Sequence, residues 1–364
     1  MAEFDSYRPP QEPRRPRRRD QAEGERPRGP KKRRGEELMV PEASFEHFDS
    51  YYGKPIVKFP PWEWPIGVYF FLGGLAGGSS LLAVGADATG NKELRRNMRI
   101  SSMAAAAVGS GCLVLDLGRP ERLLNMFRVF KLSSPMSVGS WLLGSFSALQ
   151  GLAMLPELDE LTGKKLPLPS PLRSFIEFAA TPAGIAGGVL ASPLAAYTAV
   201  LIGNTSVPAW QEAGKNLPFV FVSSATAATG GMGLLTTSTE NAAVPRALGV
   251  VGAAADVAAT SYMTSQLDDV SKEAFSTGKA GKLFKASEVC LAVGGVGALF
   301  SKKSRVLAGI SGVALMAGSC LTRFAVLEAG KQSTEDPKYV VEPQRERLRK
   351  RREAGKVDDG ITTA

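Results

Sequence analysis

Long apolar runs alternate with short polar segments through the middle of the chain. Most of the runs reach the length of about 20 residues that a helix needs to cross the hydrocarbon core of a bilayer. The eight runs cover residues 66–86, 100–115, 137–155, 175–201, 217–235, 244–265, 286–300 and 306–327. This pattern predicts an all-α membrane protein with eight transmembrane helices.

The fourth run, 175–201, is the longest and contains Pro182 and Pro193. Two short helices here would leave backbone polar groups facing lipid without hydrogen-bond partners. A single helix that bends at its prolines keeps most of these groups paired. We therefore expect one long, kinked helix.

Polar, charged segments flank the apolar middle, so the mean hydropathy of −0.03 hides a membrane protein. We divide the chain into a disordered basic tail (1–45), an interfacial segment (46–61), a membrane domain (62–329) and a polar, basic C-terminal tail (330–364). Because the net charge is +9 and the chain enters a membrane, we expect the basic runs to contact anionic lipid headgroups or a partner subunit. We expect no nucleic-acid partner.

Histidine and cysteine usage argues against a metal centre in this chain. The single histidine, His47, precedes the first apolar run, so no intramembrane bis-histidine haem site can form. Cys112, Cys290 and Cys320 lie far apart within apolar runs, without metal-ligand spacing. We interpret the cysteines as packing residues and predict no haem, iron-sulfur cluster or metal site here.

Charge and proline are concentrated in the segment between the second and third runs. It reads Asp116-Leu117-Gly118-Arg119-Pro120-Glu121-Arg122, followed by Ser134-Pro135-Met136-Ser137 and Trp141. Charges beside a membrane are costly unless they are paired, which makes this segment a candidate functional site. An interfacial turn whose arginines meet lipid phosphates explains the composition equally well.

Three charged residues of the later runs are candidates for a function or for pairing. Asp256 is near the middle of the sixth run, where it serves either as a proton-relay carboxylate or as a hydrogen-bonding group that locks helices together. Glu288 and Arg323 lie at similar depths in the antiparallel seventh and eighth runs. For these two we expect an ion pair.

An even number of spans places both termini on the same side of the membrane. The loops between the spans carry similar positive charge, whereas both tails are strongly basic. By the positive-inside rule, we expect a multi-pass protein of the cell inner membrane with both termini in the cytoplasm. The segment after the second span then lies on that same side.

Several motifs together resemble the NrfD family, the membrane subunits of polysulfide reductase and related complexes. Tyr69-Phe70-Phe71-Leu72-Gly73-Gly74-Leu75-Ala76-Gly77-Gly78 resembles the family's first helix, and the segment from Asp116 to Trp141 resembles its hallmark loop. Ala329-Gly330-Lys331-Gln332-Ser333 is similar to a C-terminal family pattern.

The resemblance implies eight helices in two four-helix bundles, with a quinone site in the first bundle. It also implies an iron-sulfur partner subunit that exchanges electrons with a molybdopterin-type catalytic subunit, of the polysulfide reductase or formate dehydrogenase type. The chain itself would be a non-catalytic subunit of that oxidoreductase complex, binding menaquinone or ubiquinone. In well-known members the catalytic partner lies outside the cytoplasm, which conflicts with the topology expected from the tails.

By position, five residues are candidates for the quinone site, and they are Trp62, Glu63, Asp116, Arg119 and Trp141. A carboxylate can transfer the protons of quinone chemistry, and an arginine can stabilise negative charge on a quinone oxygen. Two structural alternatives stand beside these roles. Asp116 and Arg119 would form a pair that only holds the loop in place, and Trp141 would be an interfacial anchor. Competing functions are a secondary transporter or proton channel built around Asp256, and a purely structural anchor.

Overall fold

The computed structural model describes residues 55–165, 167 and 169–355. The expected tail at 1–45 and the first part of the interfacial segment lie outside these residues. Eight helices of the described chain are long and apolar enough to cross a membrane, as predicted. They are α1 (Trp64–Ala88), α2 (Lys92–Asp116), α3 (Pro135–Leu161), α4 (Ser170–Gly203), α6 (Leu217–Thr236), α7 (Ala243–Gln266), α9 (Gly278–Phe300) and α10 (Arg305–Glu335).

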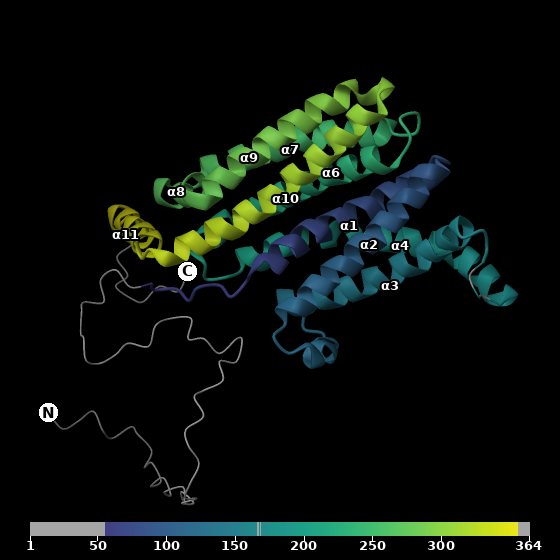
Figure 1. Cartoon of the computed structure of the whole chain (residues 1–364). Coiled ribbons are helices and arrows are strands. Elements are labelled where there is room, and N and C mark those ends of the chain that lie inside the picture. The colour runs from purple at the N-terminus through teal and green to yellow at the C-terminus, as the bar shows by residue number, and fades with distance from the viewer. Residues whose placement is uncertain (1–54, 166, 168, 356–364) are drawn as a thin grey trace, which may run out of the picture. The chain divides into compact units, whose positions relative to one another are not determined.

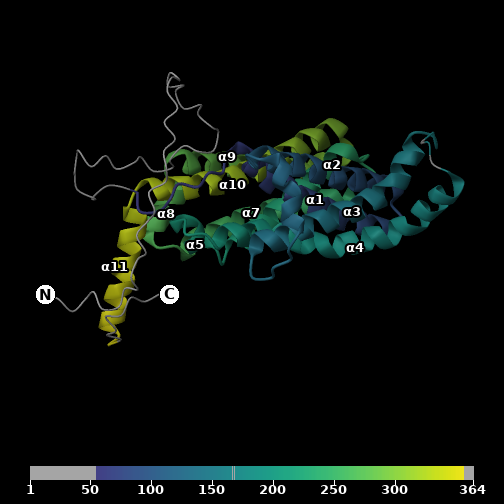
Figure 2. The same ribbon diagram turned by 90° about the horizontal axis from the view of Figure 1, so that it is seen from below.

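The spans form two four-helix bundles (Figures 1 and 2). In the first bundle, α1 packs against α2 and α4, and α3 packs against α4 and α2. In the second, α10 packs against α9 and α6, and α7 packs against α6 and α9. The bundles meet where α6 contacts α1 and α4, and where α10 contacts α1. We call the end of the spans where α1 begins and α10 ends the terminal face, and the other end the opposite face.

Several helices extend beyond the apolar runs that predicted them. The polar segment between the first two apolar runs is the first part of α2, which begins at Lys92. The Asn91 side chain caps this helix by accepting a hydrogen bond from the Leu94 amide at 3.1 Å. Similarly, α3 continues past the apolar run to Leu161 and carries Glu157 and Asp159. Charges at these helix ends therefore belong to the bundle.

The fourth span is one continuous helix with Pro182 and Pro193 inside it, as expected. In the second bundle, glycines bring α6 and α7 into direct backbone contact. A Cβ atom added to Gly230 would lie 2.2 Å from the Gly249 backbone nitrogen. Small residues allow this close approach, which lipid-embedded helices use to gain packing contacts.

Short helices connect or follow the spans. They are η1 (Pro120–Phe127), α5 (Pro208–Ala213), α8 (Asp269–Ser276), η2 (Ser301–Lys303) and α11 (Lys338–Glu353). The basic C-terminal segment is thus helical as far as Glu353, which its composition did not predict. α11 is held by ion pairs from Lys338 to Glu273 at 2.8 Å and from Arg347 to Glu212 at 2.9 Å.

Candidate functional site: a cavity in the first bundle

The segment between α2 and α3 is shaped by one glycine and two serines. Gly118 has a φ of +45°, a conformation that glycine adopts with little strain, and it turns the chain after α2. The Ser134 side chain caps α3 by accepting from the Ser137 amide at 3.4 Å. The Ser137 hydroxyl donates to the Val129 carbonyl at 3.0 Å. These bonds hold η1 and the following residues against the start of α3.

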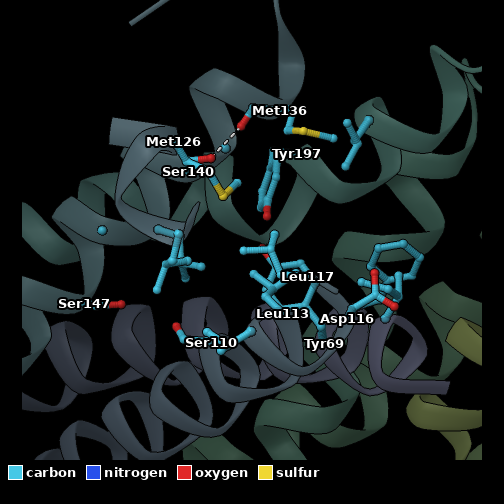
Figure 3. A pocket seen from close by; sticks show the side chains of 18 of the residues that line it. Tyr69, Ser110, Leu113, Asp116, Leu117, Met126, Met136, Ser140, Ser147 and Tyr197 are labelled. Carbon is cyan, nitrogen blue, oxygen red and sulfur yellow. Dashed lines mark hydrogen bonds between the residues drawn. The ribbon is translucent and has the colours of Figure 1, made fainter. Parts of the chain in front are cut away.

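A cavity of about 320 Å³ opens beneath this segment at the terminal face. Its walls come from the start of α1, the end of α2, η1, the first half of α3 and the end of α4, so all four spans of the first bundle contribute (Figure 3). Most of the wall is apolar. Its polar members are Tyr69, Ser110, Asp116, Ser140, Ser147 and Tyr197. We call it the terminal cavity.

Two hydroxyl groups of the terminal cavity are buried without a hydrogen-bond partner among the described residues. They belong to Tyr69 on α1 and Ser147 on α3. A third side chain, Tyr197 on α4, points into the cavity toward Leu113 and Leu117 (Figure 3). Buried polar groups are nearly always hydrogen-bonded, so unpaired hydroxyls beside a cavity favour a ligand or water that supplies the missing partner.

Two glycines of α3 make room for aromatic rings in the wall. A Cβ atom on Gly139 would lie 2.4 Å from the Tyr197 ring, and one on Gly144 would lie 2.9 Å from the Phe127 ring. Larger residues at either position would displace these rings. The α3 glycines therefore set the shape of the terminal cavity.

Residues 55–243, more than half of the chain, match the sequence model of a protein family described as polysulphide reductase, NrfD. The chain belongs to the NrfD family. A comparison with curated proteins finds no significant match. The family match includes every residue that lines the terminal cavity, and it ends before Asp256, Glu288 and Arg323.

Two of the five residues predicted for the quinone site of this NrfD protein line the terminal cavity. Asp116 is the last residue of α2, and Trp62 precedes α1. The Trp62 ring stacks on the Trp210 ring, with 5.3 Å between the ring centres. It meets the Phe70 ring edge-on, with 6.3 Å between the ring centres. Glu63 is exposed, and its negative charge repels the Asp116 carboxylate. Asp116 therefore places one carboxylate in the cavity wall, and Glu63 lies outside that wall.

Arg119 and Trp141 lie outside the cavity wall. The Arg119 side chain is exposed, and its backbone amide bonds to the Leu117 carbonyl within the turn. The Trp141 ring packs edge-on against the rings of Phe127 and Phe130, with 5.8 and 6.1 Å between the ring centres. Trp141 therefore supports η1, which forms part of the wall, rather than facing the cavity itself.

The expected ion pair between Glu288 and Arg323 is wrong. Glu288 is exposed on α9, because it follows Ser287, whose hydroxyl points inward and donates to the Gly318 carbonyl at 2.8 Å. Successive helix residues differ by about 100° in direction, so Ser287 and Glu288 cannot both face α10. Arg323 is fully buried, with its guanidinium 3.8 Å from the centre of the Phe221 ring.

Arg323 faces Asp256 instead. Asp256 is buried on α7 and accepts a hydrogen bond from the Thr322 hydroxyl at 3.2 Å. Its negative charge attracts the Arg323 guanidinium. Three polar atoms have no hydrogen-bond partner among the described residues: Oδ1 of Asp256, and Nε and Nη1 of Arg323. The two opposite charges therefore share a buried site in which the described residues do not satisfy every polar atom.

Sequence reasoning missed four charges of the first bundle, which we call the charge quartet: Asp87, Arg95, Arg99 and Glu157. Arg95 contacts Asp87 at 2.9 Å and Glu157 at 2.8 Å, and Arg99 contacts the same two carboxylates at 3.3 and 2.9 Å. The arginines lie one helical turn apart, which was the signal available in the sequence. Two arginines and two carboxylates balance in charge.

Proposed function

We propose that the chain is the quinone-interacting subunit of a membrane oxidoreductase complex. In this proposal it exchanges electrons with an iron-sulfur partner, which serves a molybdopterin-type catalytic subunit. The observation that carries the proposal is the terminal cavity, an apolar chamber with unpaired hydroxyls that opens at a membrane face. Its volume of about 320 Å³ lies within the range of about 300 to 1,000 Å³ that is typical of small-molecule sites.

The cavity residues suit a flat, apolar ligand with two carbonyl oxygens. Leu113 and Leu143 present apolar surface to a ring and exclude water from it. The Tyr69 hydroxyl can donate a hydrogen bond to a carbonyl oxygen deep in the cavity, and Asp116 can hold a proton beside one near the mouth. When bound, a quinone supplies the two-electron, two-proton chemistry that these side chains lack.

The partners and the topology belong to the same proposal. The segment from Arg119 to Lys131, which contains the wall residues Leu123, Met126 and Phe127, lies over the cavity, where an electron-carrying subunit would come within reach of the ligand. The basic helix α11 follows α10 on the terminal face, which supports cytoplasmic termini in the cell inner membrane by the positive-inside rule. In that orientation the partner docks from the cytoplasm.

A quinone titration of the full chain in lipid nanodiscs tests the site. Tryptophan fluorescence reports binding, because the Trp62 ring is part of the cavity wall. Short-chain naphthoquinone and benzoquinone titrated in parallel also show which ring the cavity prefers. Tyr69→Phe removes one hydroxyl and keeps the ring. Its affinity should fall about three- to tenfold, the value of one hydrogen bond.

Asp116→Asn should weaken binding to a similar degree. Two matched variants serve as controls, because Tyr262→Phe and Asp269→Asn make the same chemical changes at exposed positions on α7 and α8. The proposed site is wrong if the two cavity variants bind quinone as tightly as the controls do. Loss of quinone-linked turnover in the complex, with dye-linked activity of the catalytic subunit retained, would extend the result to electron transfer.

We propose proton conduction through the second bundle as an additional function, with Asp256 as the relay group. A chain of hydroxyls supports this role: Ser287 lies 2.7 Å from Thr322, which bonds to Asp256. Asp256→Asn should lower the proton stoichiometry of turnover while leaving quinone binding intact. An unchanged rate and stoichiometry would show that Asp256 only ties α7 to α10.

A further inference from the structure

The connection between the two bundles carries a large aromatic ring into the interior of the protein. It runs from the end of α4 to the start of α6 and contains the short helix α5, on which Trp210 is fully buried. The backbone closes on itself at the two ends of this connection. A Cβ atom on Gly203 would lie 2.9 Å from the Cα atom of Gly214. The connection is therefore compact, with its tryptophan on the inside.

Helix α10 of the second bundle holds α5 by two buried hydrogen bonds. The indole Nε1–H of Trp210 donates to the Val326 carbonyl at 2.7 Å. The Ala209 amide donates to the Ser333 hydroxyl at 3.2 Å. The residue before α5 is Val207, whose side chain cannot accept a hydrogen bond. Ser333 therefore supplies, from another helix, the acceptor that a capping residue would offer to the first turn.

Gly330 of α10 provides the space that the Trp210 indole occupies. A Cβ atom added to Gly330 would overlap the indole ring. Gly330 and Ser333 both belong to the segment 329–333, which resembles a C-terminal family pattern and lies beyond the residues that match the family model. The contacts give this segment a physical role, because its glycine admits the indole and its serine binds the helix that carries the indole.

Trp210 in turn supports a residue of the terminal cavity. The Trp62 and Trp210 rings are stacked, with 22° between their planes. One face of the Trp62 indole therefore lies on Trp210, and the other face and the edges remain for the cavity that Trp62 lines. Aromatic pairs contribute energy beyond the area that they bury. The stacking therefore restricts the orientations that the Trp62 ring can adopt.

We infer that Trp210 is a positioning residue of the quinone site, held by Gly330 and Ser333 of α10 and in turn holding the Trp62 ring in the cavity wall. The inference rests on the quinone function proposed above. A ring that already has its bound orientation loses less freedom when a ligand arrives, which raises affinity. The described wall of the terminal cavity contains no residue of the second bundle, yet that bundle contributes to the site in this way.

Fluorine NMR tests the position of the Trp62 ring without any ligand. The full chain is labelled with 5-fluorotryptophan in detergent micelles, and single Trp→Phe variants assign the four tryptophan resonances. Ser333→Ala removes the acceptor that holds α5, so it should shift or broaden the Trp62 resonance. The Trp141 resonance should stay in place, because that ring packs against η1. An unchanged Trp62 resonance in Ser333→Ala would overturn the inference.

Ser319→Ala is the matched control on the same helix. The Ser319 hydroxyl is also buried, and it lies 2.8 Å from the Ser224 hydroxyl of α6. This variant loses a buried hydrogen bond of α10 away from α5, so the Trp62 resonance should not move. If both serine variants move it equally, general loosening of α10 explains the shift, and the specific role of Ser333 is wrong.

A double-mutant cycle tests whether Trp210 and Ser333 act on the ligand through Trp62. Ser333→Ala should lower the affinity for a short-chain naphthoquinone about threefold, and Trp210→Leu, which removes the stacked ring, should lower it about tenfold. Calorimetry of the full chain in nanodiscs measures binding, because these changes alter the tryptophan fluorescence. In a Trp62→Leu background neither change should lower the affinity further. Equal losses in both backgrounds would overturn the inference.

The remaining outcomes are also decisive. A lower unfolding temperature in Ser333→Ala with wild-type quinone affinity would make Trp210 a packing residue only and would overturn the inference. If Trp210→Leu does not fold, the cycle with Ser333→Ala alone decides. If the wild-type protein binds no quinone, the proposed function fails, and this inference fails with it. The wild-type titration therefore separates a wrong positioning role from a wrong function.

Discussion

The two bundles both bury charge, but they accommodate it differently. In the first bundle, each arginine of the charge quartet contacts both carboxylates, and the cluster borders a cavity near the helix ends. In the second, Asp256 and Arg323 lie deep within the packed helices and leave three polar atoms without hydrogen-bond partners among the described residues. One arrangement is redundant and open to water, and the other depends on two single residues.

This difference separates two roles of small residues in membrane helices. In the first bundle, Gly139, Gly184 and Gly187 make room for tyrosine, arginine and glutamine side chains next to cavities. In the second, Gly230 lets two backbones touch. These three glycines of the first bundle therefore shape sites, whereas Gly230 allows tight backbone packing.

Arg323→Met should have the largest effect on stability. It leaves the Asp256 carboxyl buried without its opposite charge and removes the contact with the Phe221 ring. Breaking a buried charge pair in this way costs about 3–5 kcal/mol. Thermal unfolding in detergent measures the loss. The double variant with Asp256→Asn should recover part of it, and equal losses in the single and double variants would show that the two charges are not coupled.

Gly230→Ala should cost about 3 kcal/mol, at the upper end for overpacking, because backbone atoms of Gly249 cannot move aside as a side chain can. Gly85→Ala is the matched change in the first bundle, where nothing lies within 4 Å of the added atom. That variant should be neutral or gain about 0.5 kcal/mol from helix propensity. Similar unfolding temperatures for both variants would contradict the contrast in packing.

Glu157→Gln should cost about 2 kcal/mol, because it weakens two charge-assisted hydrogen bonds while Asp87 still binds both arginines. Glu273→Gln makes the same change in the more solvent-accessible pair with Lys338, where a smaller loss is expected. Denaturant titration of the detergent-solubilised protein compares the two. If Glu157→Gln lowers the free energy of unfolding as much as Arg323→Met does, the quartet is not redundant.

Gly139→Ala should act mainly on ligand binding. The added methyl group would push the Tyr197 ring from its position in the terminal cavity. We expect quinone affinity to fall about fivefold, or about 1 kcal/mol. The nanodisc titration measures it, and Gly85→Ala again serves as the control. Unchanged affinity would show that Tyr197 does not contribute to the site.

The sequence predicted the eight spans well because each apolar run satisfies a single physical requirement, the thickness of the bilayer. It also placed Asp116 and Trp62 near the site, through the motifs around them. It did not predict the helical start of α2, because the charges at Lys92 to Arg99 resemble a loop until their partners Asp87 and Glu157 are known. Those partners come from two other helices, so no local pattern reveals them.

The same limit explains the error at Arg323 and the residues missed in the cavity. Depth in the membrane suggested Glu288 as the partner of Arg323, but helix rotation decides which side chains meet, and Ser287 faces inward instead. Tyr69 and Tyr197 look like ordinary apolar-span aromatics in the sequence. Their importance emerges only when four helices bring them to one cavity.

Photolabelling with an azido-quinone tests most directly the central claim that the terminal cavity holds the ligand. The full chain in nanodiscs is illuminated with the probe, digested and mapped by mass spectrometry, with excess unlabelled quinone as competitor. We expect competitor-sensitive labels on peptides of α2, η1 and α3 that include Leu113, Met126 or Leu143. Competitor-sensitive labels confined to α6, α7, α9 and α10 would contradict the claim.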